Sequence, residues 1–256
     1  MGKAWANFLT TVDREKKKLD FKNEEECFFR GHQELGWDLT PTLLRHCRER
    51  EWEKAEKIRD FESSLFFEFR ARARELHEHS PTEWDILFSM RHHSVATRLL
   101  DWTEVLGVAV FFALRDVSEN SQPCVWILNP YALNEKSWEI RDLVAPEYLP
   151  QGDYDFSDYL IDYAGDPGFD WDEPVALYPI QRNARLHAQR GFFTIHGNDT
   201  RPLERIFPSM VKKVSLPKEA WEDARLFLQN AGIDEFLMFP DLDGLARHLH
   251  KKNNVK

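Results

Sequence analysis

Several arginines of this chain lie within apolar stretches, where a charged side chain needs a negative partner. Arg30 ends a run of one cysteine and two phenylalanines, Arg98 precedes two leucines, and Arg45 follows two leucines. A guanidinium held against a core stays charged and requires a carboxylate, carbonyl groups or a ligand anion. For one such arginine an internal pair, such as Arg98 with Asp101, is the simpler explanation. Here several arginines stand at the ends of predicted elements, and Gly31 lies beside one of them. A phosphate-binding site explains this arrangement about as well as internal ion pairs do.

The segment 91–103, RHHSVATRLLDWT, is the densest in groups that do chemistry. We expect it to join two helices. His92 and His93 are adjacent, but no third ligand follows at metalloprotease spacing and no Cys-x-x-Cys occurs, so no metal site is predicted. Ser94 lacks the surroundings of a nucleophile elbow, which disfavours a Ser–His–Asp triad. The three cysteines are widely spaced, which predicts reduced thiols rather than disulfides.

Charge is unevenly distributed along the chain. The formal net charge of −10 disfavours broad, non-specific DNA binding. Residues 142–173 contain ten acids and no Lys or Arg, whereas residues 181–213 contain seven basic residues and two acids. A polyanion is therefore expected on one face only. The candidate nucleic-acid-binding residues are Arg182, Arg185, Arg190, Lys212 and Lys213.

Apolar periodicity and turn residues predict the elements that position these groups. No apolar run is long enough to span a bilayer, and the first residues lack a signal-peptide core, so we expect a cytoplasmic protein without a membrane span. Helices mostly precede strands, which predicts an α+β fold. We expect helices over 3–18, 42–47, 51–78, 105–114 and 218–230, another beginning near 81, and strands over 27–31, 124–128, 175–178, 192–196, 210–216 and 236–239.

Four features refine these expectations. Ser80 with Glu83 forms a predicted capping box that has proline at the first helical position. Thr103 and Asp241 are the predicted caps of the helices that follow them. Residues 142–173 have no clear period and are expected to form a surface insertion.

Five motifs, in order, resemble the FRG domain family. The central one matches Gln-His-x-Gly-x-Pro-Thr-Arg-Leu-Leu-Asp-Trp-Thr through His92 and the residues from Thr97 to Thr103. Arg91, Ser94 and Ala96 replace its Gln, Gly and Pro, which leaves the loop less constrained. The motifs lie at 29–45, 92–103, 109–114, 185–194 and 239–245. The resemblance runs from about residue 24 to 250 and so implies one FRG-type domain over 1–256.

The resemblance implies a fold similar to ADP-ribosyltransferases, with an N-terminal helical part packed on a small split β-sheet. It also implies an enzyme that cleaves NAD and transfers ADP-ribose to a macromolecule, and nucleic acid is among the suspected acceptors. Such enzymes are associated with bacterial toxin and phage-defence systems. NAD would be the substrate, and no metal is expected. The implied catalytic residues are Arg30, Thr97, Asp101 and Gln189, and the implied NAD-binding residues are Arg30, Gly31, His92, Thr97, Arg98 and Trp102.

Two other interpretations remain open. Gln189 stands where many such transferases have a glutamate, and an amide cannot act as a base. The chain would then be a non-catalytic nucleotide or nucleic-acid binding module. Alternatively, the acidic, aromatic segment 142–173 resembles a polyanion mimic that an antitoxin or regulatory protein recognises or that blocks the chain's own groove. A solvated loop with a few core anchors is the simpler explanation of this segment.

Overall fold

The structure is a computed structural model that describes residues 2–52, 55–73, 81–146, 172–179, 184–253 and 255. Most of the predicted acidic insertion, residues 147–171, lies outside the described residues, as does Ser80 of the predicted capping box. In the part that is described, no helix is long and apolar enough to cross a membrane.

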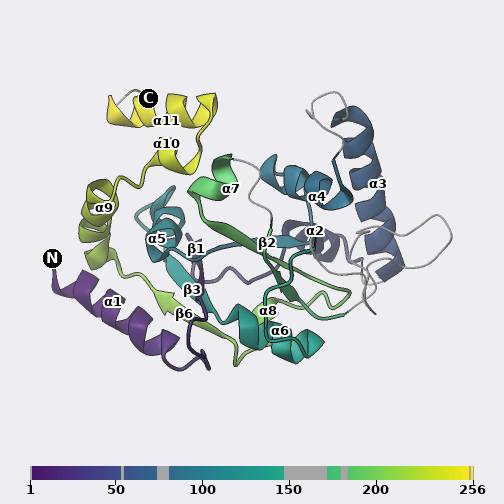
Figure 1. Cartoon of the computed structure of the whole chain (residues 1–256). Coiled ribbons are helices and arrows are strands. Elements are labelled where there is room, and N and C mark those ends of the chain that lie inside the picture. The colour runs from purple at the N-terminus through teal and green to yellow at the C-terminus, as the bar shows by residue number, and fades with distance from the viewer. Residues whose placement is uncertain are drawn as a thin grey trace.

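The described residues form a six-stranded antiparallel sheet with helices around it, which confirms the predicted α+β class (Figure 1). The strand order is β4-β5-β2-β1-β3-β6. The strands are β1 (Phe28–His32), β2 (Leu99–Thr103), β3 (Cys124–Leu128), β4 (Val175–Leu177), β5 (Gly191–Ile195) and β6 (Val211–Ser215).

The two middle strands diverge. β1 and β2 are in register at one residue pair, Phe29 with Thr103, whereas β1 with β3 and β2 with β5 are in register over five. Continued register would bring Gly31 opposite Asp101. Instead Nη1 of Arg30 donates to the Asp101 carbonyl at 2.7 Å. Within the continuous sheet, β1 and β2 therefore separate beyond this pair, and the Arg30 guanidinium lies between them.

One face of the sheet is covered by helices from both ends of the chain. α1 (Lys3–Lys16), α5 (Leu106–Leu114) and α9 (Trp221–Asn230) pack their apolar residues there with those of β3. α5 lies so close to β1 that a Cβ on Gly31 would be 1.9 Å from the Ala109 carbonyl oxygen. Glycine at position 31 is thus needed for this contact.

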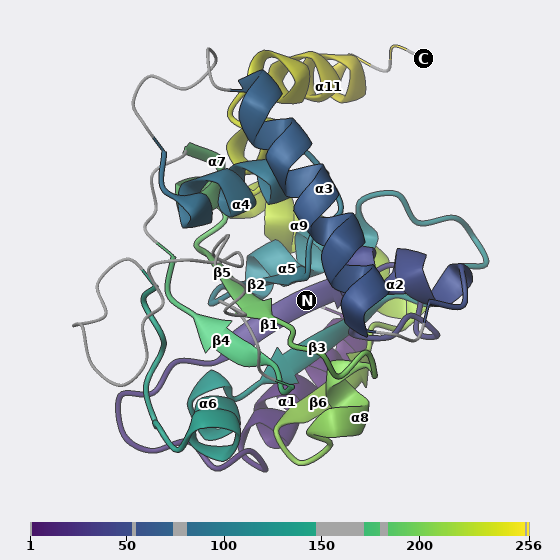
Figure 2. The same cartoon turned by 90° about the vertical axis from the view of Figure 1, so that its right-hand side faces the viewer.

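The remaining helices surround the rest of the sheet. α3 (Ala55–Ala73) and α4 (Glu83–His92) pack together against β5, through Phe66, Phe88 and Phe193 among others (Figure 2). α10 (Glu235–Met238) and α11 (Leu242–Lys252) stand together beyond α5 and α7 (Ala184–Ala188) (Figure 1). The other described helices are α2 (Thr42–Glu49), α6 (Pro130–Trp138), α8 (Leu203–Ile206) and the short 3-10 helix Lys218–Ala220.

Two predicted elements were wrong. Leu99–Thr103 is a central strand rather than part of a connection between helices. Residues 236–239 were predicted as a strand, but Glu235–Met238 is a helical turn, because Asp234 accepts hydrogen bonds from the backbone N–H of Phe236 and Leu237, each at 2.9 Å. A four-residue apolar run cannot distinguish these outcomes.

The predicted helix caps were correct in one case of three. Asp241 caps α11 by accepting from Gly244 N–H, as predicted. α4 is capped by Thr82, in a capping box with Asp85, two residues later than predicted. Thr103 ends β2 and accepts from Val105 N–H, so it orients the turn before α5 without being its cap.

Candidate functional site

A cavity of about 280 Å³ opens where β1 and β2 diverge. Its walls come from β1, β2, α5 and the end of α7. Its rim is formed by the end of α4, by α2 and by residues that precede α2. The lining residues are Phe29, Arg30, Gly31, His32, Gln33, Trp37, Arg45, Arg91, Asp101, Trp102, Thr103, Val108, Ala109, Phe112, Arg185 and Gln189. We call this space the arginine cavity.

Two arginines hold the single carboxylate that lines the arginine cavity in the described part of the chain. Arg91 Nε donates to both oxygens of Asp101 at 3.0 Å, and its Nη2 bonds Oδ2. Arg30 adds a contact from Nη1 to Oδ2 at 3.3 Å. The other side of the Arg30 group, Nε, donates to His32 Nε2 at 3.0 Å. Asp101 is thus fixed in orientation by charge-assisted bonds.

Two further arginines of the cavity form no ion pair among the described residues. Arg45 Nη2 donates to Thr42 Oγ1 at 3.1 Å. Arg185 Nη1 donates to the His92 carbonyl at 3.0 Å, and its guanidinium carbon lies 4.6 Å from the centre of the Phe239 ring. Four guanidinium groups therefore line a cavity with one carboxylate, which gives its lining a net excess of three positive charges.

The pKa values of these groups reflect that imbalance. Burial lowers the pKa of Arg30 to about 10, an effect that Asp101 opposes and Arg91 adds to. The pKa values of Arg45 and Arg185 are also lowered, first by burial and, among the charges, by Arg91. Arg91 and Arg30 hold the pKa of Asp101 well below its usual range, against a burial effect that raises it. Asp101 is thus a carboxylate at neutral pH, and an arriving anion would relieve repulsion among the arginines.

A neutral histidine and two aromatic side chains complete the cavity. Burial, together with the nearby Arg30, lowers the pKa of His32 to about 2, so its imidazole is neutral and accepts from Arg30. Trp126 Nε1 lies 3.2 Å from the other ring nitrogen, Nδ1, which carries the hydrogen of the neutral ring when Nε2 accepts. Trp37 is 49% exposed at the rim, and Phe112 lies on the α5 wall. These two rings are the flat apolar surfaces available to a ligand.

Three of the predicted site residues lie in the core. Arg98 is 2% exposed and donates from Nε to both oxygens of Glu62, at 2.8 and 2.9 Å, and from Nη1 to two backbone carbonyls. Thr97 is 1% exposed, and its hydroxyl accepts from Leu99 N–H. Trp102 borders the arginine cavity, but its ring is packed in the core and donates to Thr194 Oγ1 at 3.1 Å.

Other predicted residues do line the cavity or adjoin it. Arg30, Gly31, Asp101 and Gln189 are all in its wall. The side-chain amide of Gln189 donates to the Met238 carbonyl at 2.8 Å, so it also ties the wall to α10. His92 lies in a small adjoining recess that Arg91, Asp101 and Gln189 also border.

The predicted nucleic-acid-binding residues are distributed differently. Arg182 lies outside the described residues, and Arg185 is in the arginine cavity. Arg190 is exposed and pairs with Glu104 at 3.0 Å. On β6, Lys213 lies 4.2 Å from the centre of the Trp126 ring, and Lys212 must point to the opposite face because successive strand residues alternate.

Sequence reasoning did not assign Arg45, Arg91 or Trp37 to the site. Arg45 was visible as an arginine beside two leucines, and Arg91 as a charged residue at a motif position that usually has glutamine. Trp37 gave no signal beyond its place in the motif. Among the described residues, no group of three or more His, Cys, Asp or Glu side chains is arranged to hold a metal ion.

Comparison with known proteins gives one match. Neither a curated protein nor a solved structure matches the chain. The family model described as the FRG domain matches residues 25–122, which include β1, β2, α5 and most of the residues around the arginine cavity. The predicted resemblance is thus confirmed over residues 25–122, whereas the motifs at 185–194 and 239–245 lie outside the match.

Proposed function

We propose that the arginine cavity binds the diphosphate of NAD and that the chain transfers ADP-ribose to a macromolecular acceptor. The observation that carries this proposal is the excess of guanidinium groups over carboxylates where β1 and β2 diverge. Guanidinium groups suit the geometry of phosphate oxygens, and partly buried ones gain most from an arriving anion.

The size of the cavity fits part of a dinucleotide. About 280 Å³ is slightly below the range of roughly 300–1,000 Å³ that is typical of small-molecule pockets. The diphosphate and one flat ring would fit inside, with the ring against Trp37 or Phe112. The other half of the dinucleotide would extend past the rim.

Asp101 is the group suited to the chemical step. Cleavage of the bond between nicotinamide and ribose develops positive charge on the sugar, as in glycoside chemistry. A carboxylate that stays ionised stabilises such a charge. Because its pKa is held low by Arg91 and Arg30, Asp101 is a poor base, and the acceptor must lose its proton elsewhere.

A non-catalytic binding module is the second candidate. It is favoured by the engagement of Asp101 with two arginines and of the Gln189 amide with Met238. A module of this kind would bind NAD or another phosphorylated nucleotide without turnover.

Under the first candidate, the enzyme, the acceptor of ADP-ribose is nucleic acid and the protein acts in a toxin or phage-defence system. An antitoxin or regulatory protein would then bind the acidic segment 142–173.

Two measurements on the purified protein test these candidates. Calorimetry with NAD, ADP-ribose and inorganic pyrophosphate measures binding. Incubation of labelled NAD with RNA, DNA and cell extract measures transfer. Binding with transfer supports the enzyme, and binding without transfer or NAD loss supports the module. A folded protein that binds none of these ligands would overturn both.

Arg45→Gln is the most informative variant. It removes a cavity charge that forms no ion pair in the described structure, so folding should change little. We expect affinity for pyrophosphate to fall about tenfold or more. Arg48→Gln on the same helix is the matched control, because Arg48 pairs with Asp38 outside the cavity. Equal affinities of the two variants would remove the arginine cavity as the binding site.

A further inference from the structure

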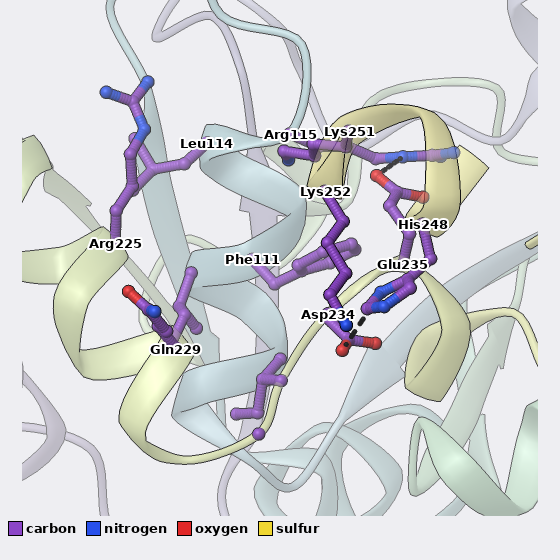
Figure 3. Close-up of a pocket in the computed structure, with 13 residues that line it drawn as sticks. Phe111, Leu114, Arg115, Arg225, Gln229, Asp234, Glu235, His248, Lys251 and Lys252 are labelled. Atoms are coloured by element: carbon purple, nitrogen blue, oxygen red, sulfur yellow. Dashed lines mark hydrogen bonds and ion pairs between the residues drawn. The ribbon is translucent and has the colours of Figure 1, made fainter. Parts of the chain in front are cut away.

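A second cavity, of about 560 Å³, is lined by other residues of α5 than the arginine cavity. Figure 3 shows the residues that line it. The two cavities share α5 as a wall. Val108, Ala109 and Phe112 border the arginine cavity, whereas Phe111 and Leu114 border the second one. The lining residues are Phe111, Leu114, Arg115, Arg225, Leu228, Gln229, Gly232, Ile233, Asp234, Glu235, His248, Lys251 and Lys252. We call it the C-terminal cavity.

The inner surface of the C-terminal cavity is apolar and mainly aliphatic. Phe111 and Leu114 of α5 meet Leu228 of α9 and Ile233 of the following turn. Phe111 is only 5% exposed, so little of its ring is available for stacking with a ligand. Such a surface suits a flexible hydrocarbon chain better than a stacked base.

The rim of the C-terminal cavity has an excess of positive charge. Its two carboxylates are engaged, since Asp234 pairs with His248 at 3.3 Å and Glu235 with Arg115 at 3.1 Å (Figure 3). Arg225, Lys251 and Lys252 form no ion pair in the part of the chain that the structure describes. The rim therefore favours a negative group on a ligand.

The helices around this cavity also expose many apolar side chains. Six of the ten large apolar residues that are exposed among the described residues belong to α9, α10 or α11. They are Leu226, Phe227, Phe236, Leu237, Leu242 and Leu249. Clustered apolar exposure of this kind commonly marks a site of interaction.

We infer that the C-terminal cavity binds an amphipathic anion, with an alkyl or acyl chain on its apolar inner surface and a carboxylate or phosphate head at the rim. The ligand is either a free acid or a lipid of a membrane, because both carry this chemistry. The inference is independent of the proposed function, since the four arginines of the arginine cavity carry that proposal and none of them lines the C-terminal cavity.

Calorimetry of the whole chain with octanoate, decanoate and octanol tests the inference. Each added methylene that enters an apolar cavity should tighten binding about fourfold, so decanoate should bind more than tenfold tighter than octanoate. Octanol lacks the charge and should bind more weakly than octanoate. Affinity that does not change with chain length would overturn the assignment.

Two pairs of variants locate the ligand. Gln229→Trp places a large side chain in the cavity from an exposed position and should abolish binding, whereas Leu226→Trp on the same helix should not. The double change Lys251→Gln with Lys252→Gln should weaken decanoate about fivefold. The control, Lys17→Gln with Lys18→Gln, removes the same charge from the two residues that follow α1 and should have no effect.

Vesicles distinguish the two sources of the ligand. Sedimentation with vesicles of phosphatidylcholine, with and without phosphatidylglycerol, measures membrane binding. Binding of monomeric decanoate without vesicle binding identifies a free acid, and both together, each lost in Gln229→Trp, identify a lipid. Vesicle binding that survives Gln229→Trp, or no decanoate binding by the folded chain, would overturn the inference.

Discussion

Arg98 and Arg30 both lie in apolar sequence and both belong to the same sheet region, yet the structure treats them differently. Arg98 is neutralised within the core by Glu62 and two carbonyls. Arg30 shares one carboxylate, Asp101, with Arg91 and has Arg45 and Arg185 nearby across a cavity. A buried arginine therefore indicates a ligand only where its neighbourhood lacks enough negative charge.

The same contrast extends to the histidine beside each arginine. His196 lies near Arg98, and neither of its ring nitrogens has a hydrogen-bond partner among the described residues. His32 accepts from Arg30 at Nε2, and its Nδ1 lies 3.2 Å from Trp126 Nε1. Burial keeps both neutral, with the pKa of His196 lowered to about 3 and that of His32 to about 2.

Breaking the Arg98 pair should have the largest effect on stability. Glu62→Gln leaves a charged guanidinium in the core, which costs about 3–5 kcal/mol when a buried pair loses one partner. Urea unfolding measures the change. The exposed pair of Glu68 with Arg72 on the same helix provides the control, and Glu68→Gln should cost less than about 1 kcal/mol. Similar losses for the two variants would contradict the core role of Arg98.

Acid should destabilise the chain through both histidines. Each is neutral in the folded state but protonates near its ordinary pKa of 6.5 once unfolded. Their contribution is complete above pH 6.5 and is lost as the pH falls below it, by at most about 1.4 kcal/mol per pH unit for each histidine. Free energies of unfolding at several pH values measure the slope. His32→Gln should reduce this slope, and an unchanged slope would contradict the burial of a neutral His32.

Asp101→Asn should separate stability from binding. It removes the shared carboxylate, and because that side chain is 40% exposed, the cost should be only about 1 kcal/mol. Freed arginines should bind inorganic pyrophosphate about fivefold tighter. Glu62→Gln, by contrast, should leave pyrophosphate affinity unchanged. Weaker binding by Asp101→Asn would show that Asp101 organises the arginines more than it competes with the ligand.

These contrasts explain what the sequence could and could not predict. Apolar periodicity identified α1, α3, α5 and α9, since each buries a stripe or a whole surface that local sequence encodes. The strand at Leu99–Thr103 was missed because it is buried on both faces and so has no alternation of apolar and polar residues. The apolar residues that flank Arg98 in the sequence do not reveal whether a carboxylate will pair with it. That carboxylate belongs to Glu62, which is 36 residues away in the sequence.

The site itself was predictable only in part. The motifs brought Arg30, Gly31, Asp101 and Gln189 into consideration, and all four line the arginine cavity. Whether Trp102 or Trp37 can stack on a ligand depends on which of the two rings is exposed in the folded chain. Trp102 is 3% exposed and Trp37 is 49% exposed, a difference that the chain's tertiary packing alone decides.

Trp37→Ala should have the smallest effect and the most specific one. Because Trp37 lies half-exposed at the rim, the free energy of unfolding should change by less than about 0.5 kcal/mol. Stacking on an aromatic ring contributes about 0.5–1.5 kcal/mol, so NAD affinity should fall by up to about tenfold while pyrophosphate affinity stays constant. Tyr178→Ala removes a ring of similar exposure outside the cavity and should change neither affinity. A parallel loss of NAD and pyrophosphate affinity in Trp37→Ala would mean that Trp37 shapes the arginine cluster instead of contacting the flat part of the ligand.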